Sequence, residues 1–318
     1  MRNKLNIINL YKLIIIAVSV LICACSSMAA SAEEYYSIGM AYFDLGRYEE
    51  AELWLNRAAQ ADRTMTASIY NLGRLAYERK RYDEAVRHFE EILKLDPFNI
   101  FALKAAAYTR IMLGDLQTAD AHYKTLLSLV PQSADDGYNH ALVLYAMNRL
   151  GEAQTVLENY PFALLDSREV ILLYARILKA QDKIEAIDVY AAFLNNYSDP
   201  KARFEYASVL EQHEFYARSL EEFRLCLSET QVSSVDPARS SIRFAIARVL
   251  LTADSTGTEG IIELEAAIEH GFNDINAVQA LMNIRGLSQI NLNNIQNIIN
   301  KMHGEDISEN NSEIDSQL

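Results

Sequence analysis

Small residues recur along this sequence at a constant interval of 34 residues. The first series consists of Gly39, Gly73, Ala107, Ala141 and Ala175, and Ala207 follows 32 residues later. A second series has the same period and consists of Ala51, Ala85, Ala119, Ala153 and Ile187, followed by Ser219. Three residues before each member of the second series stands a large side chain: Tyr48, Tyr82, Leu116, Leu150, Ile184 or Tyr216. Three registers that share one period indicate a structural repeat, in which each unit packs on the next along the chain.

Each repeat has the apolar spacing of two amphipathic helices. In the first unit, the residues that set this spacing are Tyr35, Ile38, Gly39 and Tyr42, then Ala51, Leu55 and Ala58. A small residue in each helix lets two antiparallel helices approach closely. The composition agrees, because 50% of the residues are hydrophobic while only 11 Gly and 5 Pro are present. We therefore expect an all-α protein.

Two segments carry a known repeat signature. They are residues 38–51, IGMAYFDLGRYEEA, and residues 69–97, IYNLGRLAYERKRYDEAVRHFEEILKLDP. On these residues the chain resembles the tetratricopeptide repeat (TPR) proteins. The resemblance implies a right-handed superhelix, an α-solenoid of about six helical hairpins with one concave and one convex face. The implied units are 32–65, 66–99, 100–133, 134–167, 168–199 and 200–233.

The fifth and sixth units depart from the family pattern. Asp182 and Glu214 stand where a turn glycine is expected, and Ile187 and Ser219 stand where alanine is usual. We still expect a helical hairpin in each of these units.

The period ends near residue 233, but helical patterns continue beyond it. They cover residues 240–252, 261–270, 276–284 and 291–302. We expect residues 234–303 to form a C-terminal helical cap on the solenoid. Residues 304–318 are polar and acidic, and we expect them to form a disordered tail.

Residues 1–24 have the pattern of a signal peptide. Arg2, Lys4 and Lys12 precede an apolar run over residues 13–24, which is shorter than a membrane-spanning helix. The pattern predicts that the protein is exported.

Two processing sites compete at the end of this segment. The sequence Ile22-Cys23-Ala24-Cys25 resembles a bacterial lipobox, in which Cys25 is lipidated and residues 25–31 form a tether. Cleavage after Ala32, at an Ala-Ser-Ala site, is the alternative, and an uncleaved N-terminal anchor is a third. All three interpretations place the body of the protein outside the cytoplasm, in the periplasm or cell envelope, with the membrane reached only through the N-terminus.

Charge and reactive residues argue against several function classes. A formal net charge of −14 disfavours nucleic acid and anionic lipid headgroups as partners. The six histidines form no H-E-x-x-H zinc motif, and the sequence has no glycine-rich phosphate loop or nucleophile elbow. Cys226 lies at a packing position that is usually alanine, so we expect a buried, inert thiol. The sequence thus predicts a non-enzymatic protein without a metal or other cofactor.

The resemblance also indicates a candidate binding surface. In TPR folds, the exposed positions of each first helix line the concave groove. Here these positions hold Tyr36, Met40, Phe43, Tyr70, Asn71, Arg74, Tyr77, Phe101, Lys104, Tyr108, Tyr138, Asn139, Leu142 and Tyr145. The set is rich in tyrosine and contains no acid, and Tyr and Arg are common anchors of protein interfaces. For Phe43 and Tyr77, packing between adjacent first helices is an equally good interpretation.

Four polar residues of this set suggest how a partner is held. Asn71 and Asn139 can each donate to and accept from a peptide backbone. Arg74 and Lys104 can pair with a carboxylate of the partner.

Three functional hypotheses follow. The first is an exported, lipid-anchored scaffold of the bacterial cell envelope that binds an extended segment of another protein in the groove. The second is a structural subunit of an envelope assembly that uses the convex face and the C-terminal helices. The third is a small-ligand receptor or enzyme, for which the sequence supplies no catalytic set. The residues indicate a protein or peptide partner without identifying it, and they do not fix the number of protomers.

Overall fold

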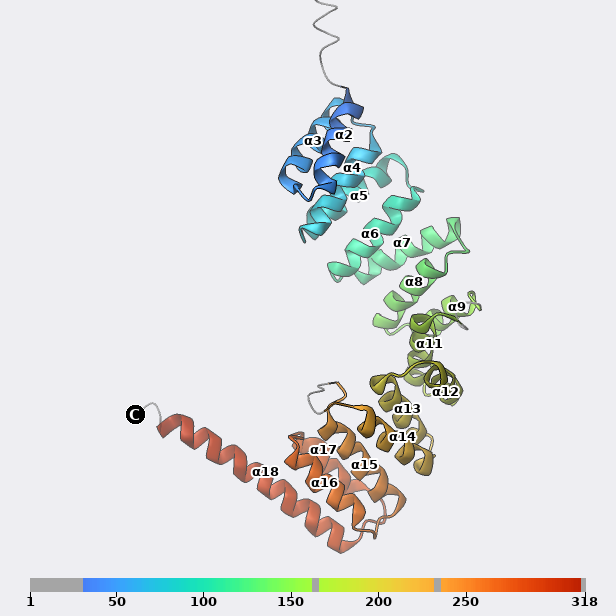
Figure 1. The fold of residues 1–318 in the computed structure, drawn as a ribbon. Coiled ribbons are helices and arrows are strands. Elements are labelled where there is room, and N and C mark those ends of the chain that lie inside the picture. The colour runs from blue at the N-terminus through green and yellow to red at the C-terminus, as the bar shows by residue number, and fades with distance from the viewer. Residues whose placement is uncertain (1–30, 162–165, 232–235, 316–318) are drawn as a thin grey trace, which may run out of the picture. The chain divides into compact units, whose positions relative to one another are not determined.

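The computed structural model describes residues 31–161, 166–231 and 236–315 (Figure 1). Every regular element in these ranges is a helix, so the predicted all-α fold is confirmed. The predicted signal segment, Cys25 and most of the tether lie outside the described residues. The chain divides into two compact units, residues 1–149 and residues 150–318.

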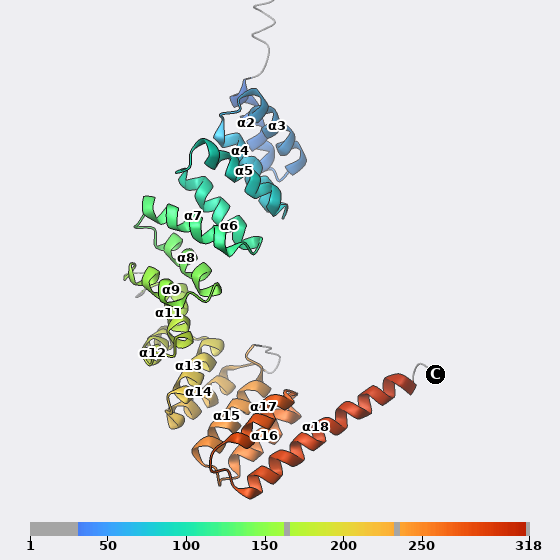
Figure 2. The same cartoon turned by 180° about the vertical axis from the view of Figure 1, so that it is seen from behind.

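Unit 1 contains three complete helical hairpins and the first helix of a fourth. Its helices are α2 (Ala32–Asp44), α3 (Tyr48–Ala61), α4 (Thr66–Glu78), α5 (Tyr82–Leu95), α6 (Ile100–Met112), α7 (Leu116–Leu129) and α8 (Ala134–Ala146). Each helix packs against the next one along the chain. The views in Figures 1 and 2 show the same succession of paired helices from opposite sides. Unit 1 is therefore an α-solenoid.

Unit 2 continues the succession of helices and ends in a cap. Its helices are α9 (Leu150–Glu158), α11 (Arg168–Ala180), α12 (Ala186–Asn196), α13 (Pro200–Gln212), α14 (Tyr216–Glu229), α15 (Arg239–Ala253), α16 (Glu259–Glu269), α17 (Ile275–Ala280), a 3₁₀ turn (Leu281–Asn283) and α18 (Gln289–Asp315). Among the described residues, no helix has both the length and the apolar character needed to cross a membrane.

The two glycines of the repeat register show why small residues are needed there. A Cβ atom on Gly39 would lie 2.8 Å from Cγ of Leu55, and one on Gly73 would lie 2.6 Å from Cε1 of Phe89. Real Cβ atoms do not approach other atoms so closely. The missing side chain thus allows the second helix of each hairpin to pack directly on the first.

The turn inside each of the first six hairpins contains one residue in the left-handed conformation, whether or not that residue is a glycine. These residues, which have positive φ angles, are Gly46, Lys80, Gly114, Asn148, Asp182 and Glu214. Asp182 and Glu214, with φ of 57° and 64°, therefore keep the turn geometry that the family pattern assigns to glycine. Stacking of the helices fixes this conformation against its intrinsic cost.

In the fifth hairpin, the observed repeat register differs by one residue from the predicted register. Ala186, Tyr190 and Phe193 are fully buried, at the same mutual spacing as Ala51, Leu55 and Ala58 in the first hairpin. The small packing residue is therefore Ala186, and the assignment of Ile187 to that position was wrong. The turn before α12 is one residue shorter than the 34-residue period requires. A search for a constant interval could not reveal this difference.

The C-terminal region begins with a seventh hairpin of the same kind. In α15 and α16, Ala247, Gly260, Leu264 and Ala267 are buried and nearly repeat the spacing of the first hairpin. A Cβ atom on Gly260 would lie 2.6 Å from Cγ of Leu251, so this hairpin is also tightly packed. The 34-residue period did not reveal this continuation of the repeat, because a longer connection separates α14 from α15.

Helices α17 and α18 then close the end of the hairpin stack. Val278, Leu281 and Ile295 are buried in one cluster with Leu264. Helix α18 continues through Asp315, so the backbone is helical over most of the segment for which the sequence predicted disorder. That segment contains no proline, the residue that most strongly ends a helix.

Candidate functional site

The predicted groove residues of unit 1 lie on α2, α4, α6 and α8, the first helices of their hairpins. We call the surface that they form the first-helix face. Neighbouring first helices contact one another through these residues. The contacts join Tyr36 to Asn71, Phe43 to Arg74, Tyr70 to Phe101, and Tyr77 to Tyr108. The structure therefore brings the predicted residues together on one surface.

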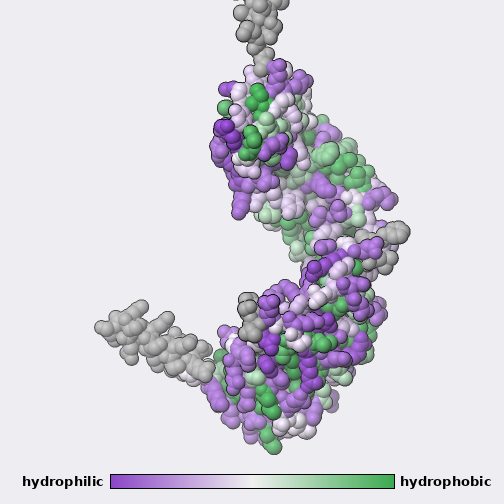
Figure 3. All heavy atoms as spheres, in the orientation of Figure 1, coloured by the Kyte–Doolittle hydropathy of each residue, from purple (hydrophilic) through white to green (hydrophobic). Residues whose placement is uncertain are grey.

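Three exposed side chains of this face are large and apolar or aromatic. Phe101 is 71% exposed, Tyr108 is 48% exposed and Leu142 is 36% exposed. Met40, Tyr138, Asn139 and Tyr145 are partly exposed. Hydrophobic residues form separate groups on the largely hydrophilic surface of each unit (Figure 3). Exposed rings held on rigid helices offer contact area that costs little conformational entropy on binding.

Asn71 does not face a partner as the sequence suggested. The residue is only 5% exposed. Its amide nitrogen donates to the hydroxyl of Tyr36 at 3.2 Å and to the carbonyl of Ala67 at 2.9 Å, and its oxygen accepts from Arg74 at 3.0 Å. Since these bonds use both donors and the oxygen, the predicted role in holding a peptide backbone is wrong. Asn71 instead positions its neighbours on the face.

Lys104 also has a partner within the protein. Its Nζ atom lies 2.7 Å from Oδ1 of Asp136, whose side chain is buried in the first turn of α8. The ammonium group therefore compensates a buried carboxylate, which could not be left unpaired without a large cost. The predicted pairing of Lys104 with a partner carboxylate would have to break this ion pair.

Arg74 remains as the cation of the face. Its guanidinium lies over the ring of Phe43, 4.9 Å from the ring centroid. Among the described residues it forms no ion pair, whereas Arg79, Arg81 and Arg110 of the same unit are paired with acids. The prediction that Arg74 can meet a carboxylate of the partner therefore stands as a proposal.

A hollow of about 200 Å³ opens between α4 and α6 on this face. It is lined by Arg74, Tyr77, Glu78, Phe89, Ala105, Tyr108 and Thr109. We call it the α4–α6 hollow. The sequence identified Arg74, Tyr77 and Tyr108, but the acid-free set of predicted residues did not include Glu78, which also lines the hollow. Glu78 follows Arg74 by four residues, one helical turn, and this spacing could have revealed it.

Tyr77 and Tyr108 both line the hollow, and their ring centroids lie 5.7 Å apart. Burial and the neighbouring hydroxyl of Tyr108 raise the pKa of Tyr77 to about 12. The phenol is therefore neutral under physiological conditions. Tyr77 thus packs between adjacent first helices and also borders the hollow, so both interpretations of this residue apply.

The corresponding positions in unit 2 carry charges that are paired or buried. By the 34-residue period, Arg74 corresponds to Arg176 and Tyr77 to Lys179. Arg176 pairs with Glu205 at 2.9 Å, and burial lowers the pKa of Lys179. Further along, Arg248 donates two hydrogen bonds, of 2.6 and 2.7 Å, to Glu211. At the positions of Arg74 and Tyr77, unit 2 therefore offers a paired or buried cation.

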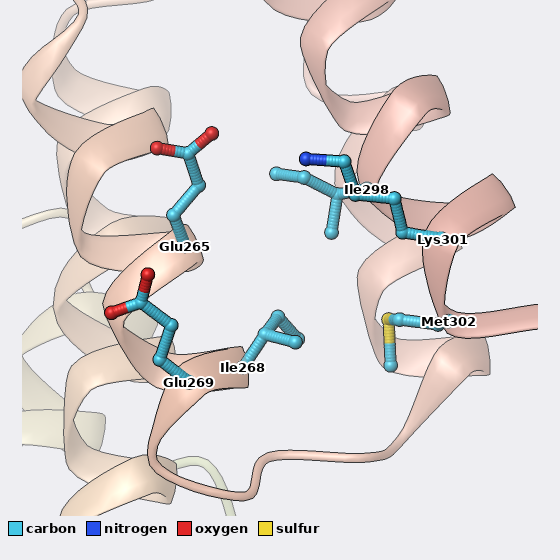
Figure 4. A pocket seen from close by; sticks show the side chains of 6 residues that line it. All are labelled: Glu265, Ile268, Glu269, Ile298, Lys301 and Met302. Atoms are coloured by element: carbon cyan, nitrogen blue, oxygen red, sulfur yellow. The ribbon is translucent and has the colours of Figure 1, made fainter. Parts of the chain in front are cut away.

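A larger hollow, of about 480 Å³, lies between α16 and α18 in unit 2 (Figure 4). Its lining residues are Glu265, Ile268, Glu269, Ile298, Lys301 and Met302. The two glutamates come from one helix and the lysine from the other. Half of the lining residues are charged and none is aromatic, so this hollow offers less to an apolar anchor than the first-helix face does.

The reactive groups of the described residues show no catalytic arrangement. No group of three or more His, Cys, Asp or Glu side chains in this part of the chain could hold a metal ion. Cys226 is fully buried as predicted, and burial raises the pKa of its thiol to about 11. The thiol is therefore protonated and shielded from solvent.

Comparisons with known proteins agree with this architecture. A family model of the tetratricopeptide repeat matches residues 32–64 and 67–99. An uncharacterized lipoprotein of Treponema pallidum is 25% identical over 162 residues, which are 51% of this chain and 83% of that protein. A tetratricopeptide repeat protein from Parabacteroides merdae, whose crystal structure is known, is 18% identical, with a TM-score of 0.54 over 79% of this chain and 97% of that one. YrrB, a TPR protein with an unusual peptide-binding site, is 16% identical, with a TM-score of 0.51 over 60% of this chain and 96% of its own. At these identities, the two solved structures show a common fold and no more.

Proposed function

From the premise that this chain is a tetratricopeptide repeat protein, we propose that it is a non-enzymatic scaffold that binds an extended segment of a partner protein across the first-helix face of unit 1. The exposed rings of Phe101 and Tyr108 on that face carry the proposal. The paired charges at the corresponding positions of unit 2 support it, because they leave few unsatisfied groups for a partner there. The peptide-binding site of YrrB, on the same fold, gives further support.

Replacing both Phe101 and Tyr108 by Ala tests the proposal. Peptides that bind the chain of residues 26–318 are first selected from a random dodecapeptide display library, and their affinities are then measured by fluorescence anisotropy. We expect the double variant to lose at least about tenfold in affinity, since rings of this kind are typical interface anchors.

A matched control replaces two exposed apolar residues on second helices of unit 1. Leu53 on α3 is 50% exposed and Leu129 on α7 is 38% exposed. The double variant L53A/L129A should bind as the unchanged chain does. Equal losses in both double variants, or no loss in F101A/Y108A, would rule out the first-helix face as the binding surface.

The proposed place of action is the bacterial cell envelope, with Cys25 as a lipid anchor. The lipobox-like sequence before Cys25 and the Treponema pallidum lipoprotein relative support this location. The mass of the mature N-terminus, measured separately on membrane and soluble fractions, tests it. A diacylated or triacylated Cys25 is expected, and an N-terminus at Glu33 would contradict the anchor.

A structural subunit of an envelope assembly is the second candidate. The hollow of about 480 Å³ between α16 and α18 favours this candidate, because it lies in the C-terminal helices that such an assembly would use. Crosslinks to a partner that map only to residues 240–302 would favour this candidate over binding at the first-helix face.

A further inference from the structure

We infer that the α4–α6 hollow receives one bulky apolar side chain of the partner segment, and that Arg74 pairs with a carboxylate next to that side chain. The inference rests on the proposed function of the first-helix face and specifies the chemistry of its ligand. Size, lining and charge each contribute to it.

The volume of the hollow fits a single side chain. At about 200 Å³ it lies below the usual range of small-molecule sites, which starts near 300 Å³. Anchors of protein interfaces, by contrast, commonly insert one aromatic or aliphatic side chain into a pocket of this kind. A leucine or phenylalanine side chain is therefore a better occupant than a free cofactor.

Two further lining residues, Phe89 and Thr109, present no unsatisfied polar group that would oppose an apolar occupant. Phe89 lines the hollow and is 2% exposed, and its ring packs against α4 at Gly73, which has no side chain. The hydroxyl of Thr109 donates to the carbonyl of Ala105 at 2.7 Å, so it seeks no partner in the hollow. Burying an apolar side chain here would remove apolar surface from water on both sides.

Two residues of opposite charge, Arg74 and Glu78, line the hollow one helical turn apart on α4. Arg74 has no acidic partner among the described residues, and a guanidinium pairs well with a carboxylate. Glu78 lies one helical turn further along α4 and also forms no ion pair among the described residues. An acidic residue of the partner is thus favoured beside Arg74 and disfavoured beside Glu78. The arrangement selects both the presence of an acid and the side of the anchor on which it lies.

A selection experiment tests both parts of the inference. A random dodecapeptide display library is selected against residues 26–318 of the unchanged chain and of three variants. Sequences enriched by the unchanged chain should share a bulky apolar residue with Asp or Glu close to it. The Ala105→Leu variant, which fills the hollow, should bind these peptides at least about tenfold more weakly. The Arg74→Glu variant should enrich Lys or Arg at the position that held the acid.

The third variant, Ala121→Leu, is the matched control. Ala121 is exposed on α7, so the same change of residue leaves the hollow open and should leave binding unchanged. Circular dichroism confirms that each variant is folded. Arg74 is exposed, so the charge reversal remains informative even if Ala105→Leu disturbs packing.

The outcomes separate this inference from the proposed function. If A105L retains the affinity of the unchanged chain while F101A/Y108A loses it, the face binds peptides without using the hollow, and the inference is overturned. If R74E enriches the same acidic sequences as the unchanged chain, the role of Arg74 is refuted. A selection in which the unchanged chain enriches nothing contradicts both proposals.

Discussion

Asp120 on α7 accepts hydrogen bonds from three side chains. It is buried, and it accepts hydrogen bonds from His140 at 2.7 Å, Arg149 at 2.6 Å and Lys124 at 3.0 Å. Burial alone would raise its pKa, but these three donors outweigh burial and hold the pKa at about 2. The carboxylate therefore joins α7 to the helix that follows it.

His140 is neutral in this arrangement. Burial is the largest influence and lowers its pKa, although the hydrogen bond to Asp120 acts in the opposite direction. The geometry places the proton on Nε2, which donates to Asp120, and leaves Nδ1 buried without a hydrogen-bond partner among the described residues. A second proton would add a positive charge near Lys124 and Arg149, which would also oppose it.

We predict that acid weakens unit 1 through His140. Because the pKa of His140 is lower in the folded than in the unfolded chain, the unfolded chain binds more protons below the unfolded value of about 6.5. Stability should therefore be full at neutral pH and fall as the pH drops through that value. Urea unfolding at several pH values between about 7.5 and 5 measures the slope, which should be smaller in His140→Gln.

His303 provides the control for this prediction. Its side chain lies on α18 and is exposed. The change His303→Gln should leave the slope as it is. Burial also lowers the pKa of His88 and His122, so part of the slope should remain in His140→Gln. An identical slope in the unchanged chain and in His140→Gln would contradict the assignment.

At the scale of single elements, α2 begins with a complete capping box. The hydroxyl of Ser31 accepts from the backbone of Glu34 at 3.2 Å, and the carboxylate of Glu34 accepts from the backbone of Ser31 at 2.8 Å. This pair satisfies two backbone donors that the first turn would otherwise leave open. A mature chain that begins near residue 25 keeps the box, whereas one that begins at Glu33 loses it.

Replacing Ser31 by Ala should destabilise the start of unit 1 by about 1 kcal/mol. Hydrogen exchange of the α2 amides measures the effect, and protection should fall in the first turns of α2. Ser37→Ala serves as the control, because the Ser37 hydroxyl bonds only to the carbonyl of Glu33 within the helix. Equal protection of α2 in S31A and in the unchanged chain would show that the cap contributes nothing.

The sequence predicted the elements well wherever the repeat was regular. Small and apolar residues at helical spacing were enough for the hairpins of unit 1, because the same residues that set the period also form the core. The helices α15 and α16 were predicted as a pair, but the register at Ala186 and the continuation of the repeat into α15 and α16 were missed, because each follows a connection whose length breaks the period. Loop length is weakly constrained by the helices that it joins, so a constant interval cannot reveal it.

The candidate site was predicted only in part for a related reason. Phe101 and Tyr108 are exposed as their helix positions require. The partners of Asn71 and Lys104, however, are Tyr36 and Asp136, which come from neighbouring repeats. Whether a polar residue of the face serves a ligand or the fold depends on side-chain geometry between repeats, which the period does not encode.

At the scale of the whole molecule, stability should be distributed locally along the chain. Within each unit, consecutive helices pack on one another, so a defect should spread over adjacent helices and no further. Leu264 is fully buried in the C-terminal cluster, whose residues come from the helices between α15 and α18. Among the described residues, those printed in this cluster all lie between Phe244 and Met302.

We predict that Leu264→Ala destabilises the C-terminal helices by about 3 kcal/mol, since it leaves a cavity in a packed cluster. Hydrogen exchange followed by mass spectrometry should show reduced protection in α15 to α18 and unchanged protection in α2 to α7. Binding of selected peptides at the first-helix face should also be unchanged. A uniform loss of protection along the chain would instead indicate a single cooperative fold.

The hydrogen bond between Asn71 and Arg74 has a consequence for the kinetics of recognition. An exposed arginine usually loses much rotational freedom when it meets a carboxylate, and that loss weakens binding. Here the amide of Asn71 and the ring of Phe43 already restrict the guanidinium before any partner arrives. The entropy of Arg74 is therefore lost during folding and not during association. A partner would meet a side chain already close to its bound conformation, and the complex would dissociate more slowly than one formed with a freely rotating arginine.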